Sequence, residues 1–107
     1  MPRFTRTRAE AVLPQAEPLL QDLQRHVSAY RRNPSDPVAR EIRALVHEIG
    51  HLGIEVKDPT QGLIDFRAMR DGREVQLCWK LGEGPRILYW HELDAGFAGR
   101  RAIDPLN

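Results

Sequence analysis

The segment His47-Glu48-Ile49-Gly50-His51 has the residue types and spacing of a zinc-hydrolase motif. In H-E-x-x-H motifs, two histidines on one face of a helix bind Zn²⁺, and the glutamate acts as general base for the metal-bound water. On this interpretation His47 and His51 are candidate metal ligands, Glu48 is the candidate catalytic residue, and zinc is the cofactor. A zinc-dependent hydrolase is therefore one hypothesis for the function.

The position of the motif on its helix favours a different interpretation. At about 100° per residue, both histidines lie roughly 160° from the centre of the apolar stripe of residues 38–52. A catalytic zinc site needs a third protein ligand, and after His51 no histidine follows until His91. We expect a solvent-facing histidine pair that binds metal only adventitiously, and no cofactor.

A second group of polar residues falls on one face of a predicted sheet. Asp71-Gly72, between two runs of alternating apolar residues, predicts a tight hairpin, and residues 82–85 predict the next loop. The resulting register aligns Asp65, Cys78 and Tyr89 in one cross-strand row, and Arg67, Gln76 and His91 in the neighbouring row. This outer face could bind a small polar ligand. The alternative is an ordinary solvated sheet face, on which polar residues alternate outward.

Two further features have simpler structural explanations. Cys78 is the only cysteine, and we expect a small residue on a sheet face rather than a nucleophile. The segment from Asp94 to Arg100 contains two glycines and could bind an anion with its backbone. It lacks the lysine of a phosphate loop, so a structural loop held by an Asp94–Arg100 pair is expected.

Two amphipathic helices are predicted in the first half of the chain. Apolar residues recur at spacings of three and four between residues 9 and 30 and again between residues 38 and 52. Thr5 or Thr7 caps the first helix, and Asp36 caps the second. Pro14 and Pro18 should kink the first helix or delay its regular part. Their short connection predicts an antiparallel hairpin that ends near Gly53.

After Gly53 the apolar residues follow a period of two, which predicts a small antiparallel sheet. Its inner face, covered by the helices, carries Ile64, Phe66, Leu77, Trp79, Leu88 and Trp90, while Leu63, Met69 and Ile87 lie on the outer face. The predicted fold is α+β, an antiparallel two-helix hairpin packed on three to four strands. It forms a single domain over 1–107, with the hairpin in 1–53 and the sheet and C-terminal loop in 54–107.

The composition is that of an ordinary small globular protein. Of its 107 residues, 41% are hydrophobic and 29% are charged, and the net charge of +1 provides no field to attract nucleic acid. No apolar run is long enough for a membrane span, and the N-terminus lacks the apolar core of a signal peptide. We therefore expect a cytoplasmic protein without nucleic-acid or membrane partners.

The segment GLIDF…DGREVQLCWKLGE…YWHELDAGFAGR, together with Phe4-Thr5 and Leu13-Pro14, resembles the domain-of-unknown-function family numbered 2203. The similarity extends over nearly the whole chain and is most specific between Gly62 and Arg100. The resemblance implies no reaction, and it implies an ordinary acidic and apolar helix at residues 47–51. The residues that match the family signature are Asp65, Trp79, Glu83, Trp90, His91, Asp94 and Arg100.

The leading functional hypothesis is a non-enzymatic binding or assembly module that associates with a second copy of itself. A sheet has two faces, and a helical hairpin covers only one of them. The first helix is also long enough to extend beyond a sheet of short strands, which leaves apolar positions near Val27 and Tyr30 uncovered. Two-fold homodimers are the commonest way to bury such a surface.

Overall fold

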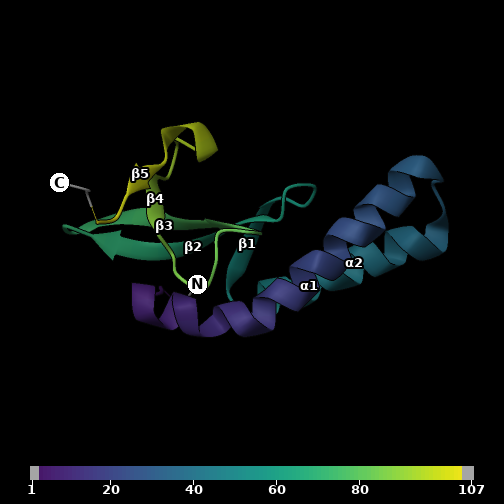
Figure 1. Ribbon diagram of the computed structural model, residues 1–107, viewed down its shortest axis with the longest axis horizontal. Coiled ribbons are helices and arrows are strands. Elements are labelled where there is room, and N and C mark those ends of the chain that lie inside the picture. Colours follow the sequence, from purple (N-terminus) through teal and green to yellow (C-terminus); the bar gives the residue numbers. More distant parts are fainter. Residues whose placement is uncertain (1–2, 105–107) are drawn as a thin grey trace.

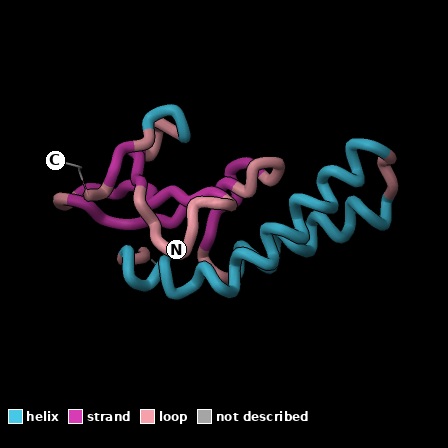
Figure 2. The backbone as a smooth tube through the Cα atoms, in the orientation of Figure 1, coloured by secondary structure: helices cyan, strands magenta, loops and turns pink. Residues whose placement is uncertain are grey.

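The computed structural model describes residues 3–104 and has an α+β fold (Figure 1). Two helices precede an antiparallel sheet whose strands lie in the order β1-β2-β3-β4-β5. The elements are α1 (Arg6–Arg32), α2 (Asp36–His51), β1 (Ile54–Asp58), β2 (Leu63–Arg70), β3 (Arg73–Lys80), β4 (Tyr89–Glu92), the 3₁₀ helix η1 (Phe97–Gly99) and β5 (Arg101–Ala102). The predicted α+β class, two helices on an antiparallel sheet, is confirmed. The sheet has five strands rather than the predicted three to four, because the chain returns along β4 to form the short β5 (Figure 2).

The helix ends follow from local capping. The Thr5 hydroxyl accepts a hydrogen bond from Arg8 N at 3.2 Å and starts α1. The second cap is Ser35 rather than the predicted Asp36, because the Ser35 hydroxyl accepts from the Val38 N–H. Pro14 and Pro18 lie inside α1, and Figure 1 shows the helix changing direction along its length, as proline in a helix favours.

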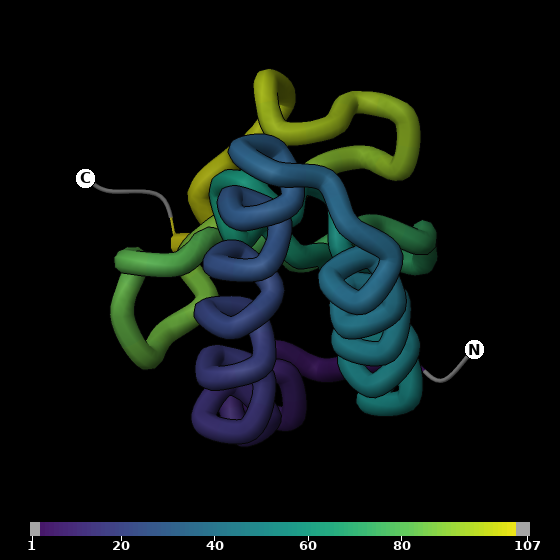
Figure 3. Tube along the Cα trace, turned by 90° about the vertical axis from the view of Figure 1, so that its right-hand side faces the viewer, coloured from purple at the N-terminus to yellow at the C-terminus, as the bar shows by residue number. Residues whose placement is uncertain are grey.

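The first half of α1 lies against the inner face of the sheet, and its second half extends beyond it beside α2 (Figure 1). The two helices run side by side in the perpendicular view (Figure 3), and the molecule measures 47 × 26 × 25 Å. Both tryptophans belong to the core, as predicted, and the Trp79 indole N–H donates to Gly84 O at 2.9 Å. The other buried core residues include Ala9, Leu13, Leu20, Ile64, Phe66 and Leu77.

The predicted strand register is confirmed for the β2–β3 hairpin and for β4. Asp71 and Gly72 have φ values of 51° and 78°, which is the backbone of a two-residue hairpin turn. Leu77 pairs with Trp90 and Cys78 pairs with Tyr89.

The prediction was wrong for Leu88 and Ile87, because β4 begins only at Tyr89. Leu88 is exposed, whereas Ile87 is fully buried in the core rather than on the outer face. Glu10 Oε2 accepts from Ile87 N at 2.9 Å, and Arg6 Nε donates to Ile87 O at 2.9 Å. These α1 side chains take the backbone groups that a longer β4 would pair with β3.

Within residues 3–104, neither helix combines the length and the apolar character that a membrane crossing requires.

Candidate functional site

The outer face of the sheet carries a buried polar cluster. The two predicted rows are observed, with Asp65 opposite Cys78 and Gln76 opposite His91. The exposed fractions are 1% for Asp65, 0% for Cys78 and 2% for His91, and Gln76 is also buried. The alternative of an ordinary solvated sheet face was therefore wrong for these four residues. Four polar side chains withdrawn from water require partners, because an unpaired buried polar group is costly.

Asp65 and His91 form a hydrogen-bonded pair across β3. His91 Nε2 lies 2.9 Å from Asp65 Oδ2, and His91 Nδ1 lies 2.7 Å from Glu92 O. A carbonyl oxygen only accepts hydrogen bonds, so Nδ1 carries a hydrogen and Nε2 is the ring atom directed at Asp65. A hydrogen bond between Nε2 and Oδ2 requires a second hydrogen, carried either by the ring or by the carboxyl group. In both cases the net charge of the Asp65–His91 pair is zero.

The Cys78 thiol completes the cluster. Burial raises the pKa of Cys78 to about 12, and the neighbouring Asp65 charge adds to this effect. Burial also raises the pKa of Asp65, although the charge of His91 opposes it. The thiol is therefore protonated at neutral pH, and in this state it is a poor nucleophile. One donor atom from each of Asp65, Cys78 and His91 lies within 4.8 Å of the other two.

Two oxygen atoms on this face have no hydrogen-bond donor. Asp65 Oδ1 and Gln76 Oε1 are both buried and without a partner among the described residues. Gln76 Nε2 donates to Glu55 Oε1 at 3.3 Å, and a carboxylate cannot donate in return, which fixes the orientation of the amide. Two buried donors beside these acceptors, Arg67 Nε and Arg100 Nε, also lack a partner among the described residues.

Arg100, from the segment that follows β4, lies over the part of the cluster at Cys78 and Tyr89. Its guanidinium binds both oxygens of Glu83, at 2.6 and 2.7 Å, and Nη2 donates to Cys78 O at 3.3 Å. It also stacks over the Tyr89 ring at 4.1 Å. Burial alone would lower the pKa of Arg100, but the bound Glu83 carboxylate raises it, so the guanidinium stays protonated.

The expected Asp94–Arg100 pair was wrong, because Arg100 pairs with Glu83 and Asp94 is exposed. Glu83 is in the turn after β3, where its Oε1 also accepts from Lys80 N at 3.0 Å. The remaining predicted residue, Arg67, is partly exposed and lies 3.6 Å from Glu55 and 3.5 Å from Glu74.

The second candidate site lies on α2. His47, Glu48 and His51 are all exposed. The two histidines lie with their Nε2 atoms 2.9 Å apart, so they present one face as the i, i+4 spacing requires. Within residues 3–104, the only group of three potential ligands is Asp65, Cys78 and His91. The structure therefore brings His47 and His51 together without a third ligand from the described chain.

Sequence reasoning missed two of the residues that define the site. Glu83 was named only as a residue that matches the family signature, and nothing in the sequence pointed to Glu55. A buried cation such as Arg100 requires a carboxylate nearby, so a search for the partner of Arg100 in the adjacent turn would have found Glu83.

The fold and the buried cluster define a small α+β protein with a Cys, His and Asp centre beneath an arginine cover. The chain belongs to the family described as "Uncharacterized conserved protein (DUF2203)", which it matches over residues 28–103. No curated protein and no solved structure shows significant similarity to it.

Proposed function

We propose that this protein is a non-enzymatic binding module that holds one divalent transition-metal ion between Asp65, Cys78 and His91. Thiolate, imidazole and carboxylate form a mixed donor set that suits Zn²⁺. The observation that carries the proposal is the convergence of these three donors, from three strands, within 4.8 Å inside a buried face.

The side-chain geometry supports a metal at this position. Zinc–ligand bonds of about 2.0–2.3 Å place donor atoms about 3.3–3.7 Å apart, so the cluster needs side-chain shifts of about 1 Å. Histidine ligands usually donate their second ring N–H to a carbonyl or carboxylate, as His91 does to Glu92 O. Asp65 Oδ1 is buried without a hydrogen-bond donor, and a bound cation would supply the missing partner.

Charge balance also supports the proposal. Without metal the cluster holds two exchangeable protons, one on the Cys78 thiol and one between Asp65 and His91. A divalent ion that displaces both protons into solvent leaves the cluster neutral, so the buried face acquires no net charge. Metal uptake must then strengthen as the pH rises, because the two released protons compete with the ion.

A non-enzymatic role fits the covering of the cluster. Three protein ligands leave a fourth coordination position, which catalytic zinc sites keep open to water or substrate. Here the Arg100 guanidinium, fixed by Glu83, lies over the same strands as Cys78 and Tyr89. A reduced thiol ligand also favours a reducing compartment, so we propose a cytoplasmic location.

Cobalt titration tests the proposal, because Co²⁺ occupies zinc sites and a thiolate ligand gives it a near-ultraviolet charge-transfer band. Untagged protein should bind one equivalent with this band. Cys78→Ser should abolish the band, and His91→Gln should weaken binding at least tenfold. The matched control is the double variant His47→Ala/His51→Ala, which should bind cobalt like the wild type. Binding lost in the control but kept in Cys78→Ser would instead support the zinc-hydrolase motif, with Glu48 as base.

We also propose self-association, for which a separate surface provides support. The second half of α1 and the helix α2 beside it extend beyond the sheet (Figure 1), and Tyr30 of α1 and Val46 of α2 expose 39% and 41% of their surfaces. Two helices alone leave one side of their apolar stripe uncovered, which a second hairpin can bury as a four-helix bundle. The expectation of an uncovered Val27 was wrong, because Val27 is partly buried against the core. Ile87, predicted on the outer sheet face, cannot contribute either, because it is buried in the core.

Sedimentation at micromolar concentration tests this surface. We expect twice the chain mass of 12.3 kDa for the wild type and the chain mass itself for Tyr30→Asp or Val46→Asp. Glu41→Ala, an exposed change on α2, serves as control and should remain dimeric. A wild-type monomer contradicts the proposal.

A further inference from the structure

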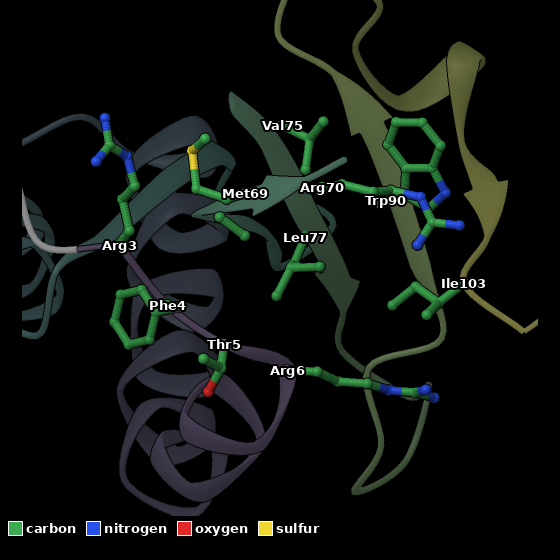
Figure 4. A pocket seen from close by; sticks show the side chains of 11 residues that line it. Arg3, Phe4, Thr5, Arg6, Met69, Arg70, Val75, Leu77, Trp90 and Ile103 are labelled. Atoms are coloured by element: carbon green, nitrogen blue, oxygen red, sulfur yellow. The ribbon is translucent and has the colours of Figure 1, made fainter. Parts of the chain in front are cut away.

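A cavity of about 380 Å³ lies at the inner face of the sheet, the face opposite to the polar cluster. Figure 4 shows the side chains that line it. Its volume falls within the range of small-ligand sites, at the lower end. The apolar residues that line it are Phe4, Ala68, Met69, Val75, Leu77, Trp90 and Ile103. The cavity shares no residue with the proposed metal site, so the two are independent.

The path of the chain explains why this part of the sheet is open. Phe4 N donates to Arg67 O at 2.7 Å, which places the N-terminal segment beside β2 just beyond Phe66, the partner of the first residue of β1. α1 then starts at Arg6, and its first buried residue is Ala9. The inner face beyond the helix start is therefore bordered by residues 3–6 on one side and Ile103 on the other, as Figure 4 shows.

The cavity lining is positively charged. It includes Arg3, Arg6 and Arg70 and no carboxylate. Arg6 is already paired with Asp104 at 2.7 Å, and Arg3 is 3.4 Å from Glu74. Arg70 has no ion pair within residues 3–104, and its guanidinium lies 4.8 Å from the centre of the Trp90 ring. Figure 4 shows this arginine and the indole at the same side of the cavity.

A second guanidinium and an unpaired donor occur at the same indole. Arg101 lies 5.2 Å from the centre of the Trp90 ring, so two cations flank one aromatic side chain. Trp90 Nε1 is buried and has no acceptor among the described residues, whereas the Trp79 indole N–H is bonded to Gly84 O. An indole N–H can only donate, so Trp90, one of the residues that line the cavity, holds a buried donor without an acceptor.

We propose that the cavity binds a small amphiphilic monocarboxylate. The apolar body lies on Leu77 and the Trp90 ring, and the carboxylate accepts from Trp90 Nε1 and Arg70. Arg70 is held only by stacking and turns toward the carboxylate on binding, which opens Nε1. Arginine and carboxylate match in geometry and charge. A ligand of about ten non-hydrogen atoms suits the volume, with a dissociation constant on the order of 0.1–1 mM.

Octanoate titration followed by NMR of the two indole N–H signals tests this site. The Trp90 signal should shift with saturation, and the Trp79 signal should remain in place because its hydrogen bond is unrelated to the cavity. Arg70→Gln should weaken octanoate binding at least tenfold. The matched control is Arg73→Gln, in the same hairpin but outside the cavity lining, which should leave binding unchanged.

Octanol and octylamine distinguish the chemistry of recognition. Both should bind at least tenfold more weakly than octanoate, because neither offers a negative charge. Octanol binding equal to octanoate, no shift of the Trp90 signal, or equal shifts of both indole signals would each overturn the proposal. Ala68→Leu provides a second variant that fills the cavity floor, and it should eliminate the octanoate response in a folded protein.

Discussion

The replacement Arg100→Lys should loosen the cover of the polar cluster. Arg100 makes a two-pronged ion pair with Glu83, donates to Cys78 O and stacks on Tyr89. Lysine keeps the charge but cannot reproduce the fork or the planar stacking. Because Cys78 is the only cysteine and is fully buried, its thiol reports the opening of this segment directly.

The expected magnitude follows from the contacts that are lost. A hydrogen bond to a charged group contributes about 1.5–3 kcal/mol, and a cation–π contact about 0.5–2 kcal/mol. Lysine recovers part of this, which leaves a net loss of about 2 kcal/mol. Since about 1.4 kcal/mol corresponds to a factor of ten, the open population should increase about 30-fold.

The assay is the rate at which an aromatic disulfide reagent modifies Cys78 in protein freed of metal by a chelator. We expect Arg100→Lys to react about 30 times faster than the wild type. Arg40→Lys, an exposed change on α2, should react at the wild-type rate. A rate for Arg100→Lys that stays close to wild type would refute the assignment of Arg100 as the cover.

Three further variants test the fold. Trp79→Ala should lower the free energy of unfolding by about 3–5 kcal/mol, and a near-wild-type melting temperature would show that its burial is not stabilising. Glu10→Gln should lower it by about 1 kcal/mol at neutral pH. Burial opposes the ionisation of Glu10, but hydrogen bonds from Ile87 N and Arg86 lower its pKa. In chemical denaturation, the stability difference between wild type and Glu10→Gln should therefore persist above this pKa and vanish as the pH falls through it. Gly62→Ala should destabilise the fold by about 1–3 kcal/mol in the same assay. Gly62 has a φ of 66°, and a Cβ at this position would collide with the Leu81 side chain. An unchanged free energy of unfolding would contradict this prediction.

The sequence predicted those parts of the fold that local rules determine. The Asp71-Gly72 turn and the period-two pattern gave the correct pairing of β2, β3 and β4. The segment before β4 was predicted incorrectly, because Glu10 and Arg6 bind the backbone of Ile87. Such contacts join residues about eighty positions apart, and no local pattern encodes them.

For the candidate site, the sequence predicted which residues share a face but not that they are buried. The register correctly brought Asp65, Cys78 and His91 onto one face. Their burial was not predicted, because alternation along a strand says which face a residue occupies and nothing of what covers that face. The cover depends on the return of the chain after β4 and on the Glu83–Arg100 ion pair, which is a tertiary contact.

Metal analysis of untagged protein is the most direct test of the metal centre. The protein is loaded with Zn²⁺, dialysed against a weak chelator, and analysed for zinc per chain. We predict one retained equivalent in the wild type and in His47→Ala/His51→Ala, and essentially none in Cys78→Ser. Retention by Cys78→Ser, or loss of zinc from the wild type, would contradict a metal centre at Asp65, Cys78 and His91.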